Sequence, residues 1–157
     1  MNRLPASKKM SQKRPRVFGT IDEAISQAEK ALGFAFPPSF RQWLLNNNGR
    51  QLEYVTIKPV FDERDPRSTF DSLVREFQLN WLAWLENFEE EKETFEHLLP
   101  FSPTGSGDYY CFDYSRCAEN GECPVVFWSH ETGECQDRAA NFEEFLEAAA
   151  IGSFEFD

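Results

Sequence analysis

The chain has 157 residues, with 16 Lys or Arg against 27 Asp or Glu, so its formal net charge at pH 7 is −11. This length predicts one domain that buries about two-thirds of the surface exposed by its unfolded chain. The apolar runs are only a few residues long, which excludes a transmembrane helix and predicts no membrane partner.

The positive charge is concentrated at the N-terminus. Six Lys or Arg and no acidic residue precede residue 17, and the other ten face all 27 Asp or Glu, so residues 17–157 carry a formal charge of −17. We expect residues 1–17 to be a disordered basic tail, followed by one domain over residues 18–157. Such a tail can also bind nucleic acid or serve as a localisation signal. The tail lacks the apolar segment of a signal peptide and the chain has four Cys, so we expect a cytoplasmic protein with reduced thiols.

Two helices open the predicted domain. Thr20 followed by Glu23 predicts a capping box, and apolar residues at helical spacing continue to Gly33, which predicts a helix over residues 21–33. A second helix is expected to start at Pro38 or Ser39 and to end in the run of asparagines at residues 46–49.

The middle of the chain is predicted to combine a strand, a loop and a long helix. Leu52–Val60 is β-branched enough for one strand or two short ones. Residues 62–66 predict a solvated loop. From Ser68 to about Phe88 the apolar residues keep a helical period, which predicts one long helix, or two with a break near Asn80. The acidic run that follows predicts a solvated helix face.

Three β-segments form the expected centre of the fold. They are Leu98–Phe101, Asp108–Tyr114 and Pro124–His130, joined by turns that contain Gly105-Ser106-Gly107 and Asn120-Gly121. The second segment alternates apolar residues onto both faces, which is typical of a central strand with helices on each side. We predict an antiparallel meander with helix 21–33 packed on it.

A last helix is predicted to begin at Asn141, with Glu144 at the box position. The chain shows no internal repeat and no dividing linker. The predicted fold class is therefore α+β, a single domain with a mostly antiparallel sheet flanked by helices.

The residues that carry chemistry form no recognisable catalytic or metal pattern. The four Cys lack closely spaced pairs, so we expect free thiols and no cofactor, although turns can still bring Cys117, Cys123 and Cys135 together around a metal. His130 stands alone, without a nucleophile elbow or a second His, and a strand-end His bonded to a turn is the expected role.

Four blocks in this order resemble the SUKH superfamily, the Smi/Knr-type domain. They are residues 21–49 (IDEAISQAEKALGFAFPPSFRQWLLNNNG), 98–114 (LLPFSPTGSGDYYCFDY), 124–134 (PVVFWSHETGE) and 141–150 (NFEEFLEAAA). The resemblance implies an α+β domain and, in bacteria, an immunity protein, often encoded beside a polymorphic toxin that is in many cases a nuclease. In fungi the domain belongs to cell-wall and signalling regulators. The family has no known catalytic set, so none is carried over. Residues 62–97 are longer, more acidic and richer in Trp than the family pattern.

The predicted function is protein binding, not catalysis. We expect an immunity protein that neutralises a cognate toxin, most simply a basic nuclease domain, by stoichiometric binding, because surface carboxylates can take the place of phosphates in such a site. The acidic body is not expected to bind nucleic acid directly. A regulatory scaffold for a cellular protein is the alternative, solubility alone would also explain the charge, and monomer and weak dimer both remain open. The candidate partner-binding residues are Asp62, Glu63, Asp65, Glu89, Glu90, Glu91, Glu93 and Tyr109.

Overall fold

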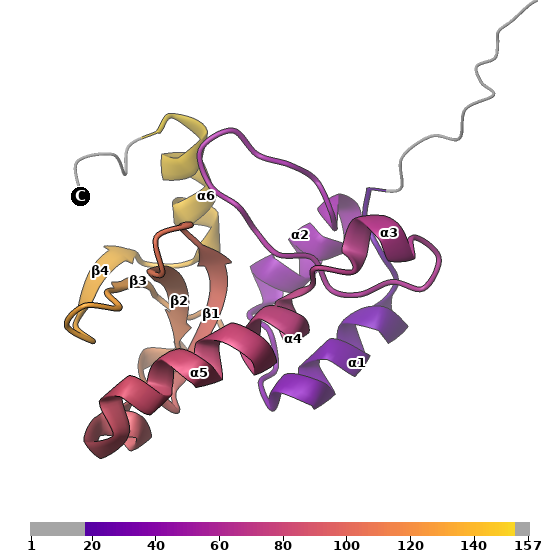
Figure 1. Ribbon diagram of the computed structural model, residues 1–157. Coiled ribbons are helices and arrows are strands. Elements are labelled where there is room, and N and C mark those ends of the chain that lie inside the picture. The colour runs from indigo at the N-terminus through magenta and orange to yellow at the C-terminus, as the bar shows by residue number, and fades with distance from the viewer. Residues whose placement is uncertain (1–17, 153–157) are drawn as a thin grey trace, which may run out of the picture.

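Figure 1 shows the computed structural model, which describes residues 18–152 apart from the side chains of residues 91–94. The tail predicted over residues 1–17 lies outside the described residues, as does the segment 153–157. The described chain is a single α+β domain, as predicted from the sequence. Its helical elements are α1 (Asp22–Leu32), α2 (Pro38–Asn47), α3 (Pro66–Thr69), α4 (Leu73–Glu76), η2 (Phe77–Trp81), α5 (Leu82–Leu85), η3 (Glu86–Phe95), η4 (Tyr114–Arg116) and α6 (Phe142–Ala150).

The described residues form a four-stranded sheet in the order β1-β2-β3-β4, with every neighbouring pair antiparallel. Its strands are β1 (Leu98–Pro103), β2 (Tyr109–Asp113), β3 (Val125–Trp128) and β4 (Cys135–Ala139). The predicted meander, with β2 beside β3, is confirmed. The edge strand β4 was not predicted, because its residues are mostly polar and exposed and lack an apolar alternation. A polar edge of this kind resists pairing with other chains.

The central strand β2 is buried on both faces, as its alternation predicted. Tyr110 and Phe112 belong to a large core, whereas Tyr109 and Cys111 belong to a second, smaller core. Since both faces are apolar, helices must cover both to remove that surface from water.

The large core joins α1, α2 and α6 to one face of the sheet. Phe40 of α2 is fully buried at its centre, and its ring centroid lies 5.2 Å from that of Phe112 and 5.1 Å from that of Phe142. Helix α1 contributes Ala24, Ile25, Ala28 and Leu32 to this core and also packs on α2 and α4, so it closes the outer side of the core.

The second core is covered by the segment from η2 to η3. Trp81 of η2 packs against Trp128 of β3 with ring centroids 4.8 Å apart, and Tyr109 lies 5.3 Å from Trp81. The helix predicted from Ser68 to Phe88 is interrupted at Phe70–Ser72, where the Ser72 side chain accepts from the backbone N–H of Arg75 and starts α4. The expected break near Asn80 is instead a π-helical turn, η2, within an otherwise continuous helix.

The helix ends follow local chemistry in two of three cases. Gly33 ends α1 in the left-handed conformation with φ of 83°, and Asn141 caps α6 by accepting from the backbone N–H of Glu144. The capping box predicted at Thr20 is wrong: Ile21 is the N-cap, and the hydroxyl of Thr20 donates to Asp62 at 2.6 Å. The hydroxyl of Thr20 therefore binds a buried carboxylate that is distant in sequence and does not cap the helix.

The strand predicted over Leu52–Val60 is also wrong, since this segment is irregular. At its last residue both backbone groups are paired with a side chain: Asn48 is 1% exposed, its Nδ2 donates to the carbonyl of Val60 and its Oδ1 accepts from the N–H of Val60. The N–H of Lys58 donates to the carbonyl of Phe101, which holds the segment beside β1. One buried amide thus takes the place of strand pairing at Val60.

The free thiols expected at Cys117 and Cys123 are corrected by the structure, which joins these residues in a disulfide. The turn around Gly121 brings them together, through hydrogen bonds between Ala118 and both Gly121 and Glu122. Cys111 is buried and free, and Cys135 is exposed and free.

We expect Asn48→Ala to lower the free energy of unfolding by about 3 kcal/mol, because it leaves both buried backbone groups of Val60 unpaired. Asn46→Ala is the matched control: Asn46 is exposed and makes one local hydrogen bond to Gln42, so its loss should cost less than about 1 kcal/mol. Urea unfolding of both variants measures the difference, and equal costs would contradict this role of Asn48.

The disulfide is not expected to be required for folding. Its cysteines are 6 positions apart, and closing so short a loop contributes at most about 2 kcal/mol in the chain-entropy account. Cys117→Ser should therefore keep a cooperative unfolding transition at a lower midpoint. Loss of that transition would show that the core depends on the bond.

Candidate functional site

The predicted partner-binding residues lie in separate parts of the molecule. Asp62, Glu63 and Asp65 lie on the loop before α3, and Glu89 and Glu90 lie on η3, at the opposite end of the helical path from α3 to η3 (Figure 1). They do not form one continuous surface. Tyr109 lies within the sheet, and the side chains of Glu91 and Glu93 lie outside the described residues.

Asp62 is not a solvated residue, because it is only 3% exposed. Its carboxylate accepts from the hydroxyl of Thr20, from the backbone N–H of Arg64 and from the guanidinium of Arg64, at 2.6 to 3.2 Å. The hydrogen bonds from Arg64 are the largest cause that lowers the pKa of Asp62 to about 2, against the opposing effect of burial. Through these bonds Asp62 connects Thr20, at the start of the domain, to the loop before α3. Its neighbour Glu63 is exposed, and Asp65 is half-buried.

Tyr109 is equally internal, at 2% exposure. Its hydroxyl donates to Oε2 of Glu76 at 2.5 Å, and burial followed by this bond raises the pKa of Tyr109 well above its usual range. The ring packs within the second core, so Tyr109 positions Glu76 rather than offering an exposed anchor.

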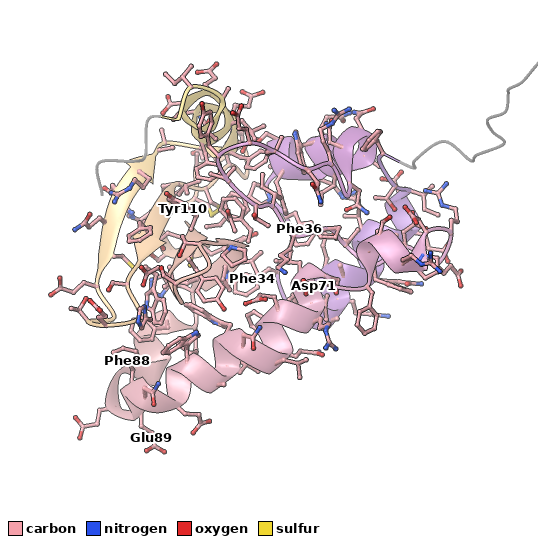
Figure 2. All side chains as sticks on the ribbon, turned by 45° about the horizontal axis from the view of Figure 1, so that its top comes forward. Phe34, Phe36, Asp71, Phe88, Glu89 and Tyr110 are labelled. Atoms are coloured by element: carbon pink, nitrogen blue, oxygen red, sulfur yellow. A yellow bond between two sulfur atoms is a disulfide. The ribbon has the colours of Figure 1, made fainter. Side chains whose placement is uncertain are left out.

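An exposed acidic surface remains at the η3 end of the molecule. Glu89 and Glu90 are exposed there, and Phe88 beside them turns inward, as Figure 2 shows for Phe88 and Glu89. Phe88 packs against the turn between β3 and β4: a Cβ placed on Gly133 would lie 3.0 Å from Phe88 and 3.2 Å from Phe95. That turn carries two further exposed carboxylates. We call the set Glu89, Glu90, Glu131 and Glu134 the acidic end.

The acidic end was only half visible in the sequence. The solvated face with Glu89 and Glu90 was predicted, but nothing local indicated that the turn between β3 and β4 touches it. The sequence signal that was available is Gly133 itself. In the structure it has a φ of +75°, and a side chain there would meet the rings of Phe88 and Phe95.

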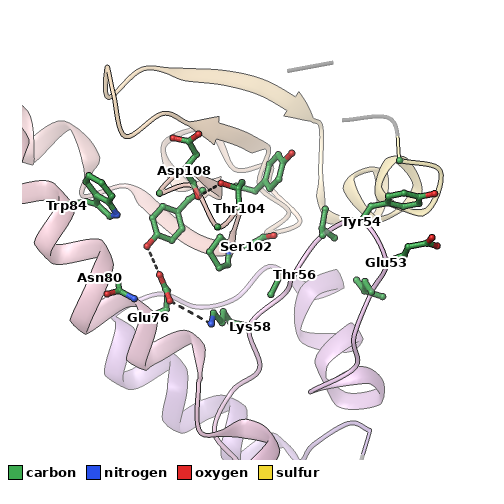
Figure 3. A pocket seen from close by; sticks show the side chains of 18 residues that line it. Glu53, Tyr54, Thr56, Lys58, Glu76, Asn80, Trp84, Ser102, Thr104 and Asp108 are labelled. Carbon is green, nitrogen blue, oxygen red and sulfur yellow. Dashed lines mark hydrogen bonds and ion pairs between the residues drawn. The ribbon is translucent and has the colours of Figure 1, made fainter. Parts of the chain in front are cut away.

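A cleft of about 680 Å³ lies between the helical path, the irregular segment after Asn48 and the sheet (Figure 3). One wall comes from the helical path and carries Asn80 and Trp84, with Glu76 at its base. The irregular segment after Asn48 forms the opposite wall, and β1 and β2 form the floor. The other polar or aromatic side chains that line the cleft are Glu53, Tyr54, Thr56, Lys58, Ser102, Thr104, Asp108, Tyr109 and Tyr110.

At the rim of the cleft, His130 is a bonded strand-end histidine. Its backbone N–H and its Nδ1 both lie within hydrogen-bond distance of Oδ1 of Asp108, at 2.8 and 2.7 Å, and its ring lies 4.8 Å from that of Trp84. Both contacts hold the β3–β4 turn against the β1–β2 turn and α5.

Among the described residues, no group of three or more His, Cys, Asp or Glu side chains is arranged to hold a metal ion. Within the same residues, no helix has both the length and the apolar composition needed to cross a bilayer.

Comparison with known proteins identifies one family. Residues 19–148 match the SMI1 / KNR4 family (SUKH-1), which covers nearly all of the described chain. No curated protein sequence matches the chain at a significant level.

The stability that Asp62 contributes should depend on pH. Its folded-state pKa of about 2 is below the ordinary 3.8, so its contribution is present above pH 3.8 and is lost as pH falls toward 2. Compared with the wild type, Asp62→Asn should cost about 2 kcal/mol above pH 5 and less than about 1 kcal/mol at pH 2. Unfolding by urea from pH 2 to 7 measures this. Glu63→Gln, on the exposed neighbour, should have a much smaller effect throughout, and a cost for Asp62→Asn that is independent of pH would contradict the role of its charge.

Proposed function

The chain belongs to the SMI1/KNR4 family (SUKH-1), and on that premise we propose that it neutralises a cognate toxin by stoichiometric binding, a basic nuclease domain being the favoured target. The family is known for proteins of the immunity type. In this proposal the protein acts in the cytoplasm as a non-catalytic binding domain.

The observation that carries the proposal is the acidic end, a set of exposed carboxylates supported by packed aromatic rings. The ring of Phe88 lies 5.8 Å from that of Phe95 and 5.7 Å from that of Trp128. These contacts fix the backbone of η3 and of the β3–β4 turn relative to each other. Carboxylates presented from fixed positions bind with a smaller loss of conformational entropy than carboxylates on a mobile loop.

The overall charge supports the same target. With a formal charge of −17 over residues 17–157, the body of the protein attracts basic partners over distances of about a Debye length. A nuclease site is built to hold phosphates, and carboxylates at a similar spacing can occupy it in their place. Such complementarity increases the association rate and disfavours acidic partners.

The His130–Asp108 pair is assigned a structural role in this proposal. One oxygen of Asp108 bonds both the backbone and the ring of His130, and the ring is also packed on Trp84. These contacts position the turn that carries Glu131.

Association with a basic toxin, taken from the neighbouring gene or from a pull-down in the native strain, should slow steeply as salt rises, with little change in dissociation. Replacing Glu89 and Glu90 together by Lys should slow association about tenfold or more at low salt, because steering depends on charge at the contact surface. Stopped-flow binding against ionic strength measures both effects.

The matched control replaces Glu143 and Glu147 of α6 by Lys. Both residues are exposed, and the change in net charge is the same, but α6 lies away from η3 (Figure 1). The control should slow association much less. Equal slowing by the two variants would show that net charge alone acts, and a flat salt dependence would refute steering. A captured partner that is not a toxin would favour the scaffold alternative.

A further inference from the structure

The cleft beside the acidic end has the charge of a site for a cation. Three carboxylates line it, those of Glu53, Glu76 and Asp108, against the single ammonium of Lys58. Lys58 is already paired, because its Nζ lies 2.7 Å from Oδ2 of Asp71 and 3.8 Å from Oε1 of Glu76. An anionic ligand would therefore meet net repulsion, whereas a cation would meet attraction.

Glu76 is the carboxylate placed deepest in the cleft. It is 8% exposed, and the hydroxyl of Tyr109 fixes its Oε2. Among the described residues, Oε1 has the more distant Lys58 ammonium as its partner. This oxygen retains capacity to accept a hydrogen bond, in a partly desolvated position where such a bond to a charged donor is strong.

Ser102 on the floor of the cleft supplies an independent observation. Its side chain is fully buried, and its Oγ has no hydrogen-bond partner among the described residues. A buried hydroxyl without a partner destabilises the folded state, and native proteins keep few of them. Ser102 follows an irregularity in the β1–β2 register after Pro100, and Figure 3 shows it between the walls of the cleft.

We propose that this cleft receives an arginine side chain of the protein partner. The five N–H groups of a guanidinium lie in one plane and point in several directions, which suits two acceptors, Oε1 of Glu76 and Oγ of Ser102, while the exposed carboxylate of Glu53 adds negative charge to the lining of the cleft. Trp84, on the same wall as Asn80, offers aromatic surface for the planar group. The inference rests on the proposed protein-binding function and adds the class of side chain that the partner inserts.

The cleft and the acidic end are continuous through two contacts. Trp84 of the cleft wall packs on His130, and His130 opens the turn that carries Glu131 and Glu134. Asp108, which also lines the cleft, bonds the same histidine. A basic surface placed over the acidic end would therefore lie beside the mouth of the cleft.

The test is an NMR titration of the full chain with the peptide acetyl-Gly-Arg-Gly-amide, and with the same peptide carrying neutral citrulline in place of arginine. The arginine peptide should give saturable amide shifts at Ser102, Asn80 and Thr56, with an affinity at least tenfold above that of the citrulline peptide. Ser102→Ala should weaken arginine binding about tenfold, as expected for the loss of a hydrogen bond to a charged group. It should not lower the melting temperature, because the hydroxyl has no partner to lose.

Glu53→Gln is a second variant on an exposed position and should also weaken arginine binding, whereas Glu143→Gln on α6 should leave it unchanged. Absence of saturable shifts, equal affinity for the two peptides, or unchanged affinity in Ser102→Ala would each overturn the proposal. So would shifts spread over the acidic surface in place of the cleft. None of these results involves the toxin, so the cleft can fail while charge-steered toxin binding stands, and the reverse.

Discussion

Burial of the central strand β2 on both faces is the constraint on which the rest of the structure depends. A strand with Tyr109 and Cys111 on one side and Tyr110 and Phe112 on the other cannot leave either face in water. The large core takes α1, α2 and α6, and the second core takes the path from η2 to η3. The long, Trp-rich segment between α3 and β1 therefore has a structural reason: it supplies the second cover.

That second cover also places the surfaces that are available for binding. Trp81 must face β2 and β3, so the helical path is fixed in rotation, and Trp84, one turn on, faces the β1–β2 turn and His130. The following turn brings Phe88 onto Gly133, which leaves Glu89 and Glu90 outside. The exposure of Glu89 and Glu90 and the position of the cleft thus both follow from the way in which one amphipathic segment covers one face of the sheet.

Sequence reasoning found the elements whose signals are local. Gly33, Asn141 with Glu144, and the alternation in β2 act within a few residues of themselves, so pattern alone identifies them. The capping box predicted at Thr20 was wrong because the hydroxyl of Thr20 binds Asp62, 42 positions away, and not the end of the helix. The strand predicted over Leu52–Val60 is absent, and the backbone of its last residue, Val60, is paired with the distant side chain of Asn48.

The residues of the candidate site also differ in how far their exposure could be predicted from local sequence. That Glu89 and Glu90 are exposed follows from helical periodicity, so their exposure was predictable. Asp62 looked identical in sequence, an acid in a charged loop, yet it is buried, because Arg64 and Thr20 together offset the cost of removing its charge from water. Glu76 and Ser102 gave no signal at all. A buried acid on a helix and a serine in a strand become a site only when the sheet and the helix meet.

Exposed and buried carboxylates affect binding in different ways, and this protein has both kinds near each other. Charges on the acidic end are hydrated and screened, so they change the association rate more than the lifetime of a complex. Glu76 is partly desolvated and held by Tyr109, so a cation that reaches it loses its own hydration and gains a strong, directional contact. That contact acts mainly on the dissociation rate. A partner that engages both would associate quickly through its overall basic charge and dissociate slowly because of one inserted side chain. Selectivity among basic partners would then come from the cleft, since net attraction alone does not distinguish one basic surface from another.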